Sequence, residues 1–390
     1  MVPRFRSRMA ALALAFVSFV SPADGPLDAT MDAITTRLYE AFTVEQLRSL
    51  TEDQLGAHLD DDARRTLATG YWQFDVNVPV VVSVMRHVKQ ASPPSWLAGA
   101  GFAKTDLVVK NAECDFEVWQ KAFDAGRVAL GMNGFDGHRF CYFVCVGPQT
   151  PGAEVVVSNI SPGGAPPATM IVGAVTYTDW TELVLTEVPA SLRGHVLLAT
   201  HRGRARETHL FGGFRETPFP SGPSPDQITL TWDDDPKTTQ AISWRTGPSV
   251  TSGEVRYRKK GAALRRFARV PAAYSAIQDR MLANDRTSHR FTALLRDLEP
   301  GRAYTYQVWD AARGEWGPKH TFDTAPDDAD SFSFVHLTDT HNRETAGKLL
   351  AAVCARTPAP AFAAISGDLV DMGLHRDCWD KLLTYLGAPI

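Results

Sequence analysis

The chain has 390 residues, of which 44% are hydrophobic and 22% charged, a composition typical of globular proteins and not of disordered ones. This length is too great for one ordinary domain and predicts two or three. The formal net charge of −4 gives the whole chain no basic excess, so we expect no nucleic-acid partner.

The N-terminal residues 1–23 have the three parts of a signal peptide. Basic residues between Arg4 and Arg8 precede an apolar run from Met9 to Val20, and small residues follow up to Ala23. The run is shorter than the about 20 residues that a membrane-spanning helix needs. A buried N-terminal helix is the alternative. We therefore expect a secreted or periplasmic protein, with no membrane span once the signal is removed.

The cysteines are few, odd in number and loosely spaced, which excludes a disulfide-scaffold domain and a zinc module built from CxxC pairs. They are Cys114, Cys141, Cys145, Cys354 and Cys378. One disulfide among the first three stays open, and it would agree with an oxidising compartment.

Residues 24–70 are predicted to be helical. The stretches Thr43–Gln46 and Thr51–Gln54 are capping-box patterns, and leucines recur at helical intervals between Leu47 and Leu59. Such a capped, charged segment is typical of a packing element or spacer, and we assign it no chemistry.

Residues 71–217 change to short apolar runs separated by turns rich in Gly and Pro, which predicts a β-sandwich-like domain. The runs are Trp72–Val78, Leu107–Val109, Phe140–Val144, Val155–Val157, Met170–Val172 and His195–Leu198. The histidines of this stretch have no metal-ligand spacing, so we expect surface or packing roles for them; they are His138, His195, His201 and His209. The sequence does not indicate what this domain does.

Residues 218–225 contain four prolines and predict a semi-rigid linker. A second β-rich domain, residues 226–326, follows. Its strand-like runs include 228–232, 241–244 and 255–257, and Tyr304 comes shortly after a Leu-x-Pro-Gly turn, a pattern that predicts a tyrosine corner. The acidic run Asp233–Asp235 is expected to be a solvated turn, with a calcium site as the alternative.

The stretch Pro225–Pro326 resembles a fibronectin type III domain. More specifically, it is similar to the N-terminal domain of purple acid phosphatases, which opens with Pro-x-Gln, a strand and Ser-Trp, and closes with a Phe-x-Thr strand, here Phe322–Thr324.

Residues 331–390 read as strand, helix, strand and helix. The apolar runs Phe332–Leu337 and Phe362–Ile365 are expected to be neighbouring parallel strands, Asn342 to cap the first helix, and His375–Leu386 to form the second. In such βαβ units, ligands bind beyond the carboxyl ends of the strands. Gly387 is a suitable stop for the last helix.

Three metal-ligand side chains follow those two strands: Asp339 and His341 after the first, Asp368 after the second. Hydrolysis of a phosphate ester requires that the charge of the phosphoryl group be neutralised and that a hydroxide form near neutral pH. Two adjacent cations do both, because they bind the phosphoryl oxygens and acidify a shared water molecule. A carboxylate that bridges the cations is then needed, and Asp368, after Gly367, is suited to that role. Mixed imidazole and carboxylate ligands favour Fe, Zn or Mn over calcium.

Asp-x-His followed by Gly-Asp is similar to the first two motifs of calcineurin-like metallophosphoesterases. The resemblance implies that Asp339 and His341 bind the first of two metal ions, that Asp368 is shared between them, and that the substrate is a phosphate ester. An incidental Asp and His at the strand ends of another α/β fold is the alternative reading.

The chain departs from the purple enzymes in two ways. The purple enzymes carry Gly-Asp-x-x-Tyr, and the tyrosinate of this motif binds iron; this chain has Asp371 at the tyrosine position. The purple enzymes also usually have Gly at the position of His341. The ligand set therefore resembles that of the wider, non-purple group, and we expect no tyrosinate-to-iron absorption.

The family continues with Gly-Asn-His and two further histidine motifs, none of which occurs before Ile390. We therefore expect an incomplete α/β domain, with an unstable last segment, and a 390-residue polypeptide that is catalytically inactive.

The expected architecture is thus multidomain: an N-terminal β-sandwich domain, a fibronectin III-like β-sandwich, and the start of an α/β metallophosphoesterase domain. The leading hypothesis is an exported metal-dependent phosphoesterase. Two alternatives stay open: a non-catalytic surface or adhesion protein, and a shortened phosphoesterase retained for binding.

Overall fold

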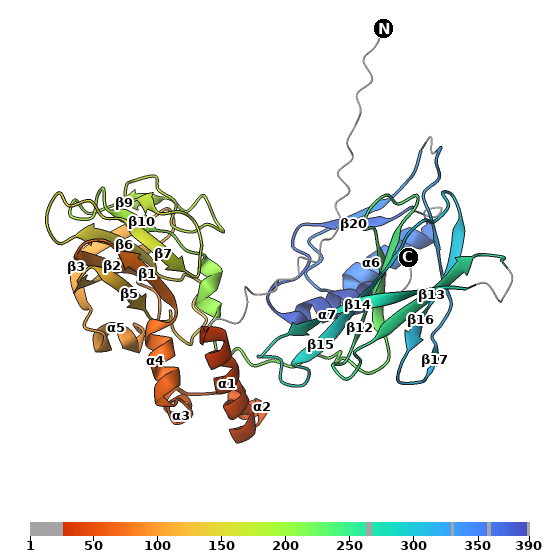
Figure 1. The fold of residues 1–390 in the computed structure, drawn as a ribbon, viewed down its shortest axis with the longest axis horizontal. Coiled ribbons are helices and arrows are strands. Elements are labelled where there is room, and N and C mark those ends of the chain that lie inside the picture. The colour runs from red at the N-terminus through yellow and green to blue at the C-terminus, as the bar shows by residue number, and fades with distance from the viewer. Residues whose placement is uncertain (1–25, 263–266, 329–330, 357–359, 388–390) are drawn as a thin grey trace, which may run out of the picture. The chain divides into compact units, whose positions relative to one another are not determined.

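The computed structural model describes residues 26–262, 267–328, 331–356 and 360–387. The chain divides into two compact units, one ending at Phe214 and the other beginning at Arg215, and each is mostly β-sheet (Figure 1). The signal peptide expected at residues 1–23 lies outside the described residues. Among those described, no helix combines the length and the apolar character needed to cross a membrane.

The described part of the N-terminal unit, from Pro26 on, begins with four helices: α1 (Pro26–Ala41), α2 (Val44–Arg48), α3 (Glu52–Gly56) and α4 (Asp61–Thr69). Both predicted capping boxes are confirmed. Thr43 and Thr51 accept from the backbone N–H of Gln46 and Gln54, whose side chains accept in return from the threonine N–H groups at 2.9 and 3.0 Å. These reciprocal bonds satisfy donors that a helix start leaves without partners, so two five-residue helices can persist.

The rest of this unit forms two sheets. The smaller has the order β5-β1-β7, and the larger β8-β10-β6-β2-β4-β3-β9. Their bounds are β1 (Trp72–Val76), β2 (Val80–His87), β3 (Ala103–Asn111), β4 (Asp115–Phe123), β5 (Gly126–Leu130), β6 (Phe143–Pro148), β7 (Val157–Ser161), β8 (Ala168–Thr169), β9 (Leu185–Glu187) and β10 (Val196–Leu198), with the short helices α5 (Ser95–Gly99) and η1 (Arg202–Arg206).

The predicted runs match these strands unevenly. The run 107–109 lies inside β3, whereas β6 and β7 begin only at Phe143 and Val157. The run Met170–Val172 is not a strand: Ala174 bonds back to Ile171, Gly173 has a φ of +90°, and Val172 is 57% exposed. A three-residue apolar run carries too little periodicity to separate a strand from a turn.

All five cysteines of the chain are unpaired thiols in the structure, so the disulfide left open among Cys114, Cys141 and Cys145 is not formed. The Sγ of Cys141 instead lies 3.1 Å from the buried hydroxyl of Tyr71. Cys145 and Cys114 belong to the core of the larger sheet.

The C-terminal unit opens with a sandwich of antiparallel strands, in the order β11-β12-β15-β14-β13-β16-β17 with β18 also on β16. Their bounds are β11 (Asp226–Thr231), β12 (Gln240–Thr246), β13 (Gly253–Lys259), β14 (Ala268–Gln278), β15 (Thr287–Leu295), β16 (Ala303–Asp310), β17 (Glu315–Trp316) and β18 (His320–Asp323). The first half of β14 pairs with β13 and its second half with β15, so one long strand passes from one side of the sandwich to the other.

The core of the sandwich contains a stacked aromatic pair, Trp244 and Phe291, with ring centroids 5.4 Å apart. The predicted tyrosine corner is confirmed, because the Tyr304 hydroxyl accepts from the backbone N–H of Glu299 at 2.9 Å. The acidic run Asp233–Asp235 is a turn between β11 and β12, and its first carboxylate pairs with Arg296.

The proline-rich segment 218–225 runs along the C-terminal unit. The N–H and hydroxyl of Ser221 donate to the Asp285 carboxylate at 2.7 and 2.8 Å, and Gly247 N–H donates to the Gly222 carbonyl at 2.6 Å. The predicted spacer is therefore anchored to the sandwich by hydrogen bonds.

Beyond the sandwich come β19 (Val335–Thr338), α6 (Glu344–Arg356), β20 (Ala363–Ser366) and α7 (Arg376–Leu386), and the two strands pair in parallel as predicted. Two details of the prediction are wrong. Strand β19 begins at Val335, and Phe332 and Phe334 are 55% and 51% exposed, because a two-stranded sheet does not cover both faces of its strands. Asn342 does not cap α6; its side chain accepts from Asp371 N–H at 2.8 Å.

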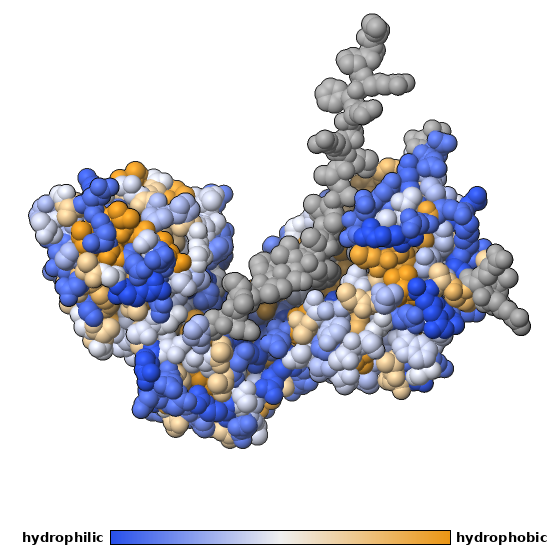
Figure 2. All heavy atoms as spheres, in the orientation of Figure 1, coloured by the Kyte–Doolittle hydropathy of each residue, from blue (hydrophilic) through white to orange (hydrophobic). Residues whose placement is uncertain are grey.

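Helix α7 lies beside the sandwich (Figure 1), and buried charges bind it there. The Asp380 carboxylate accepts from Arg245 of β12 at 2.7 Å, and the side chains of both residues are at most 4% exposed. Arg376 pairs with Asp285, and Asp377 with Arg215. Gly387 follows the helix as expected, its N–H donating to the Thr384 carbonyl. The visible face of each unit mixes hydrophilic and hydrophobic residues (Figure 2).

Candidate metal centre

The three predicted ligands come together at the carboxyl ends of β19 and β20. Asp339 directly follows β19, and Asp368 follows β20 after Gly367. Ligand atoms of Asp339, His341 and Asp368 all lie within 4.8 Å of one another. The structure thus places these side chains where one ion could contact all three, and metal binding itself stays a prediction.

Backbone hydrogen bonds continue past the ends of the strands and join the two loops that carry the cluster. Asp339 N–H donates to the Ser366 carbonyl at 3.2 Å, and His341 N–H donates to the Asp368 carbonyl at 3.0 Å. Asn342 N–H donates to Leu369 at 2.9 Å. These backbone hydrogen bonds, rather than contacts of the ligand-type side chains, therefore fix the two loops relative to each other.

The first loop has an unusual backbone. Asp339, His341 and Asn342 have φ values of 53°, 47° and 48°, in the left-handed region. Asp, Asn and His enter this region more readily than other residues with a Cβ, yet it remains sparsely populated. Strained residues of this kind cluster at functional sites, where the surrounding structure maintains them.

Gly367 is required where the loops approach each other. Its φ is +68°, and a Cβ there would lie 2.7 Å from the Thr338 Oγ1 and 3.0 Å from an Asp339 carboxylate oxygen. The Gly-Asp pair seen in the sequence therefore has a steric cause, because the glycine lets β20 end against the residues that carry Asp339.

His341 lies between two carboxylates. Its Nδ1 is 2.9 Å from Asp371 Oδ1, and its Nε2 is 3.8 Å from Asp368 Oδ2. A proton on Nδ1 that is donated to Asp371 leaves the Nε2 lone pair facing the cluster, which is the arrangement that metal-binding histidines use. From the sequence, Asp371 was noted only because it stands where the purple enzymes have a tyrosine. Its contact with His341 was not predicted, although its place three residues after Asp368 could have indicated a position near the proposed site.

The cluster is open to solvent. The side chains of Asp368, Asp371 and His341 are 74%, 51% and 32% exposed. An ion and a small anion can therefore reach it without displacing other side chains, and the described residues do not shield it from water.

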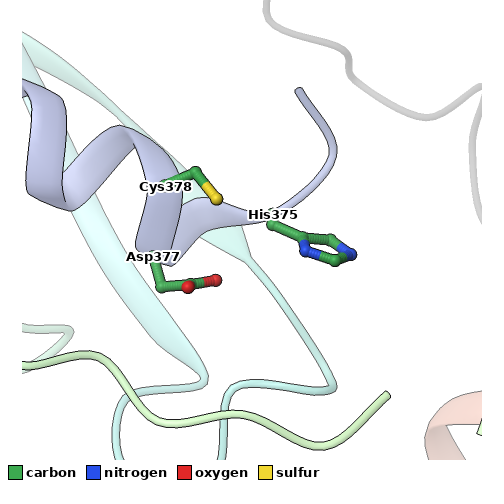
Figure 3. Close-up of side chains that lie close together, drawn as sticks. All are labelled: His375, Asp377 and Cys378. Atoms are coloured by element: carbon green, nitrogen blue, oxygen red, sulfur yellow. The ribbon is translucent and has the colours of Figure 1, made fainter. Parts of the chain in front are cut away.

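A second group of ligand-type side chains lies at the start of α7: His375, Asp377 and Cys378 (Figure 3). Asp377 is already paired with Arg215 and lies 3.6 Å from Lys381. Burial, followed by the nearby Asp377 charge, raises the pKa of the Cys378 thiol, whereas a metal needs the thiolate. We therefore interpret this group as part of the contact between α7 and the sandwich.

The N-terminal unit has a histidine pair. His87 Nδ1 and His138 Nε2 are 2.8 Å apart. Burial and the neighbouring His138 lower the pKa of His87 to about 4. Both rings are packed against Phe140, in line with the packing role expected for His138.

The comparisons with known proteins bear on the sandwich. The family model described as "Purple acid Phosphatase, N-terminal domain" matches residues 225–324. This match relates the sandwich to phosphatases. The resemblance expected for Pro225–Pro326 is thereby confirmed, and we call these residues the phosphatase-type sandwich. The resemblance of residues 331–390 to metallophosphoesterases stays a prediction.

Solved structures similar to this chain include fibronectin type III domains. One is from human contactin 1, with 15% identity and a TM-score of 0.20 over 30% of this chain and 90% of that one. Another is from the human collagen alpha-1(XX) chain, with 19% identity and a TM-score of 0.19 over 28% of this chain and 88% of that one. No curated protein matches the sequence.

Proposed function

We propose that this chain carries the first metal ligands of an exported metal-dependent phosphoesterase: Asp339, His341 and Asp368 hold the metal ions, Fe, Zn or Mn, with Asp368 shared between two ions, and the 390 residues by themselves bind metal without turnover. The observation that carries the proposal is the meeting of these three ligands at the carboxyl ends of two parallel strands, within 4.8 Å. These ligands follow the phosphatase-type sandwich directly in the sequence, which gives the proposal independent support.

The residues fit such ions chemically. Two carboxylates and one imidazole form a donor set that suits Zn, Mn and Fe. His341 has its Nδ1 next to Asp371, so that its Nε2 can face an ion, and the exposed Asp368 has room to bind on both oxygens. When bound, the metal ions would polarise the phosphoryl group and acidify a water molecule.

The chain's own residues perform the remaining tasks. Asp339 and Asp368 supply the negative charge that attracts cations to this edge. Asp371 orients the ring of His341, and the loop bonds keep the strand ends together. The open position lets a phosphate ester approach from solvent.

Metal-dependent phosphate binding tests the proposal. The chain, stripped with a chelator and titrated with Mn²⁺ or Zn²⁺ in a calorimeter, should bind the ion and then bind orthophosphate. Asp339→Asn and Asp368→Asn should each weaken ion binding by at least about tenfold, since each removes a charged ligand. Asp328→Asn, at an exposed acid before β19, is the control. Binding that is unchanged in both ligand variants would refute the proposal.

A non-catalytic surface protein is the second candidate, because most described strands belong to sandwich-type sheets that carry no assigned chemistry. It predicts no ion binding at Asp339 and no metal-dependent affinity for phosphate, so the same titration separates the two candidates.

Export is a separate part of the proposal. We expect the mature protein to begin just after Ala23, which N-terminal sequencing of the protein from the extracytoplasmic fraction checks. A mature chain that keeps Met1 would exclude cleavage.

A further inference from the structure

One face of the phosphatase-type sandwich carries a concentration of positive charge that the net charge of the chain conceals. Between Arg256 and Arg269 the sequence has seven basic residues and no acidic one. Three of them, Arg256 and Arg258 on β13 and Arg269 on β14, form what we call the arginine face.

The strand register places these side chains together on the outside. Arg256 is opposite Arg269 on one side and Gln307 of β16 on the other. The alternating neighbours Val255 and Tyr257 pack on the core. Side chains alternate along a strand, so Arg256 and Arg258 point outward.

Aromatic rings hold the arginines in place. The Arg256 guanidinium lies 4.5 Å from the centre of the Phe267 ring and 4.6 Å from that of Trp316. Arg258 lies 4.7 Å from Phe267, and Arg269 lies 5.3 Å from Trp316. These cation–π contacts restrict long side chains before any ligand arrives, so less entropy is lost on binding.

Little negative charge balances the arginine face. Between described residues, the one carboxylate within 4 Å of its guanidinium groups is that of Glu254, 3.6 Å from the 62% exposed Arg269. Burial, and then the charges of Arg269 and Arg258, lower the pKa of Arg256. An anion bound here would relieve this mutual repulsion, which gives the face an electrostatic reason to bind one.

We propose that the arginine face binds a linear acidic polysaccharide through its sulfate or carboxylate groups. Guanidinium groups form strong, charge-assisted hydrogen bonds with such groups. The Nε and Nη2 of Arg256 already donate to Gln307 Oε1 at 3.0 and 2.7 Å, so this arginine offers an anion its Nη1 side. Single-stranded nucleic acid fits less well, since it requires aromatic platforms for its bases, and here arginines already stack on Phe267 and Trp316. The proposal involves no residue of the metal cluster and stands apart from the proposed function.

Binding of labelled polymers to the full chain tests this proposal. Dextran sulfate and polygalacturonate distinguish sulfate from carboxylate recognition, neutral dextran is the uncharged control, and an oligonucleotide of matched charge represents nucleic acid. We expect binding to at least one acidic polysaccharide, weakening as salt is raised from about 50 to 200 mM, and none to neutral dextran. Binding to neither acidic polysaccharide, or equal or tighter binding to the oligonucleotide, overturns the proposal.

Variants locate the binding on this face. The double variant R256Q/R269Q should bind at least about tenfold more weakly, a loss of about 1.4 kcal/mol, whereas R296Q/K348Q removes two positive charges elsewhere in the same unit and should stay within about twofold. If R256Q/R269Q does not fold, R269Q alone, at an exposed position, should lose about threefold. Unchanged affinity in a folded arginine-face variant overturns the proposal.

Discussion

In the proposed metal site, three residues would hold the ion, and a fourth lets the two strand ends approach each other. Asp339, His341 and Asp368 would supply the ligand atoms, while Gly367 supplies a backbone conformation and a lack of side-chain volume. The functional side chains can therefore be tested separately from the glycine that positions them.

Gly367→Ala should disrupt the cluster without removing any ligand. The added Cβ would lie 2.7 Å from Thr338 Oγ1, and the φ of +68° disfavours any residue with a Cβ. We expect a loss of about 1–2 kcal/mol in unfolding free energy together with weaker Mn²⁺ binding, measured by urea unfolding and calorimetry.

Gly373→Ala is the matched control for that substitution, because a Cβ there has no neighbour within 4 Å. If Gly367→Ala binds Mn²⁺ as Gly373→Ala does, the close approach of the two loops is not needed for the site.

Tyr304 contributes to the sandwich through one hydrogen bond to Glu299 N–H. Tyr304→Phe removes the acceptor and leaves the ring, so we expect the free energy of unfolding to fall by about 1 kcal/mol. Tyr274→Phe, at a ring that is 42% exposed, should change it by much less. Equal effects in the two variants, measured by urea unfolding, would argue against the tyrosine corner as a stabilising feature.

At the scale of elements, α7 links the βαβ segment to the sandwich. Its Asp380 is buried against Arg245 of β12, and burial raises the pKa of this carboxyl. Arg245 also donates to the Asp226 carboxylate at 2.9 and 2.6 Å, so removal of Asp380 takes away one of its two carboxylate partners and the charged hydrogen bond between them.

Asp380→Ala should therefore destabilise the C-terminal unit by about 1.5–3 kcal/mol, the range for losing a hydrogen bond between charged groups, measured as a lower thermal unfolding temperature. The double variant R245M/D380L, which replaces the pair by apolar side chains, should recover most of that loss. Glu344→Ala, at an exposed pair on α6, is the control. A double variant no more stable than Asp380→Ala would show that the pair itself is needed.

The sheet edge that carries the three proposed metal ligands depends on this link. Among the described residues, β19 and β20 form a sheet of two strands, so little of their stability comes from the sheet. We infer that the contact between α7 and the sandwich supports the loops of Asp339 and Asp368, which adds a mechanical role to the phosphatase-type sandwich.

At the scale of the molecule, each unit has its own hydrophobic core and should unfold as a cooperative entity. Calorimetry of the chain should resolve two transitions, of which Asp380→Ala lowers only one.

Acid should weaken the other transition, that of the N-terminal unit. The pKa of His87 is about 4 in the folded chain, below its ordinary value of 6.5. The unfolded chain therefore binds more protons between these values, and stability should fall as the pH drops from about 6.5 towards 4. His87→Gln should flatten this dependence and His201→Gln should not, as measured by thermal unfolding across that range. If the thermal unfolding temperature depends on pH in His87→Gln as it does in the unaltered chain, His87 is not the cause of the acid sensitivity.

The sequence alone determined the order of the parts, the relation of Pro225–Pro326 to a phosphatase domain, the capping boxes and the tyrosine corner. These features depend on neighbouring residues and on local periodicity. It also placed Asp339, His341 and Asp368 at strand ends, because parallel strands bring their carboxyl ends to one edge.

Only the tertiary structure decided what surrounds those residues. The turn at Met170–Val172 and the late start of β19 depend on which surfaces are covered, and a short apolar run does not encode this. Asn342 bonds to Asp371, and Asp371 to His341, because loops distant in the sequence meet in space. The arginine face likewise appears only when β13 pairs with β14 and β16, and β17 with β16, since the net charge of a chain says nothing about where its charges gather.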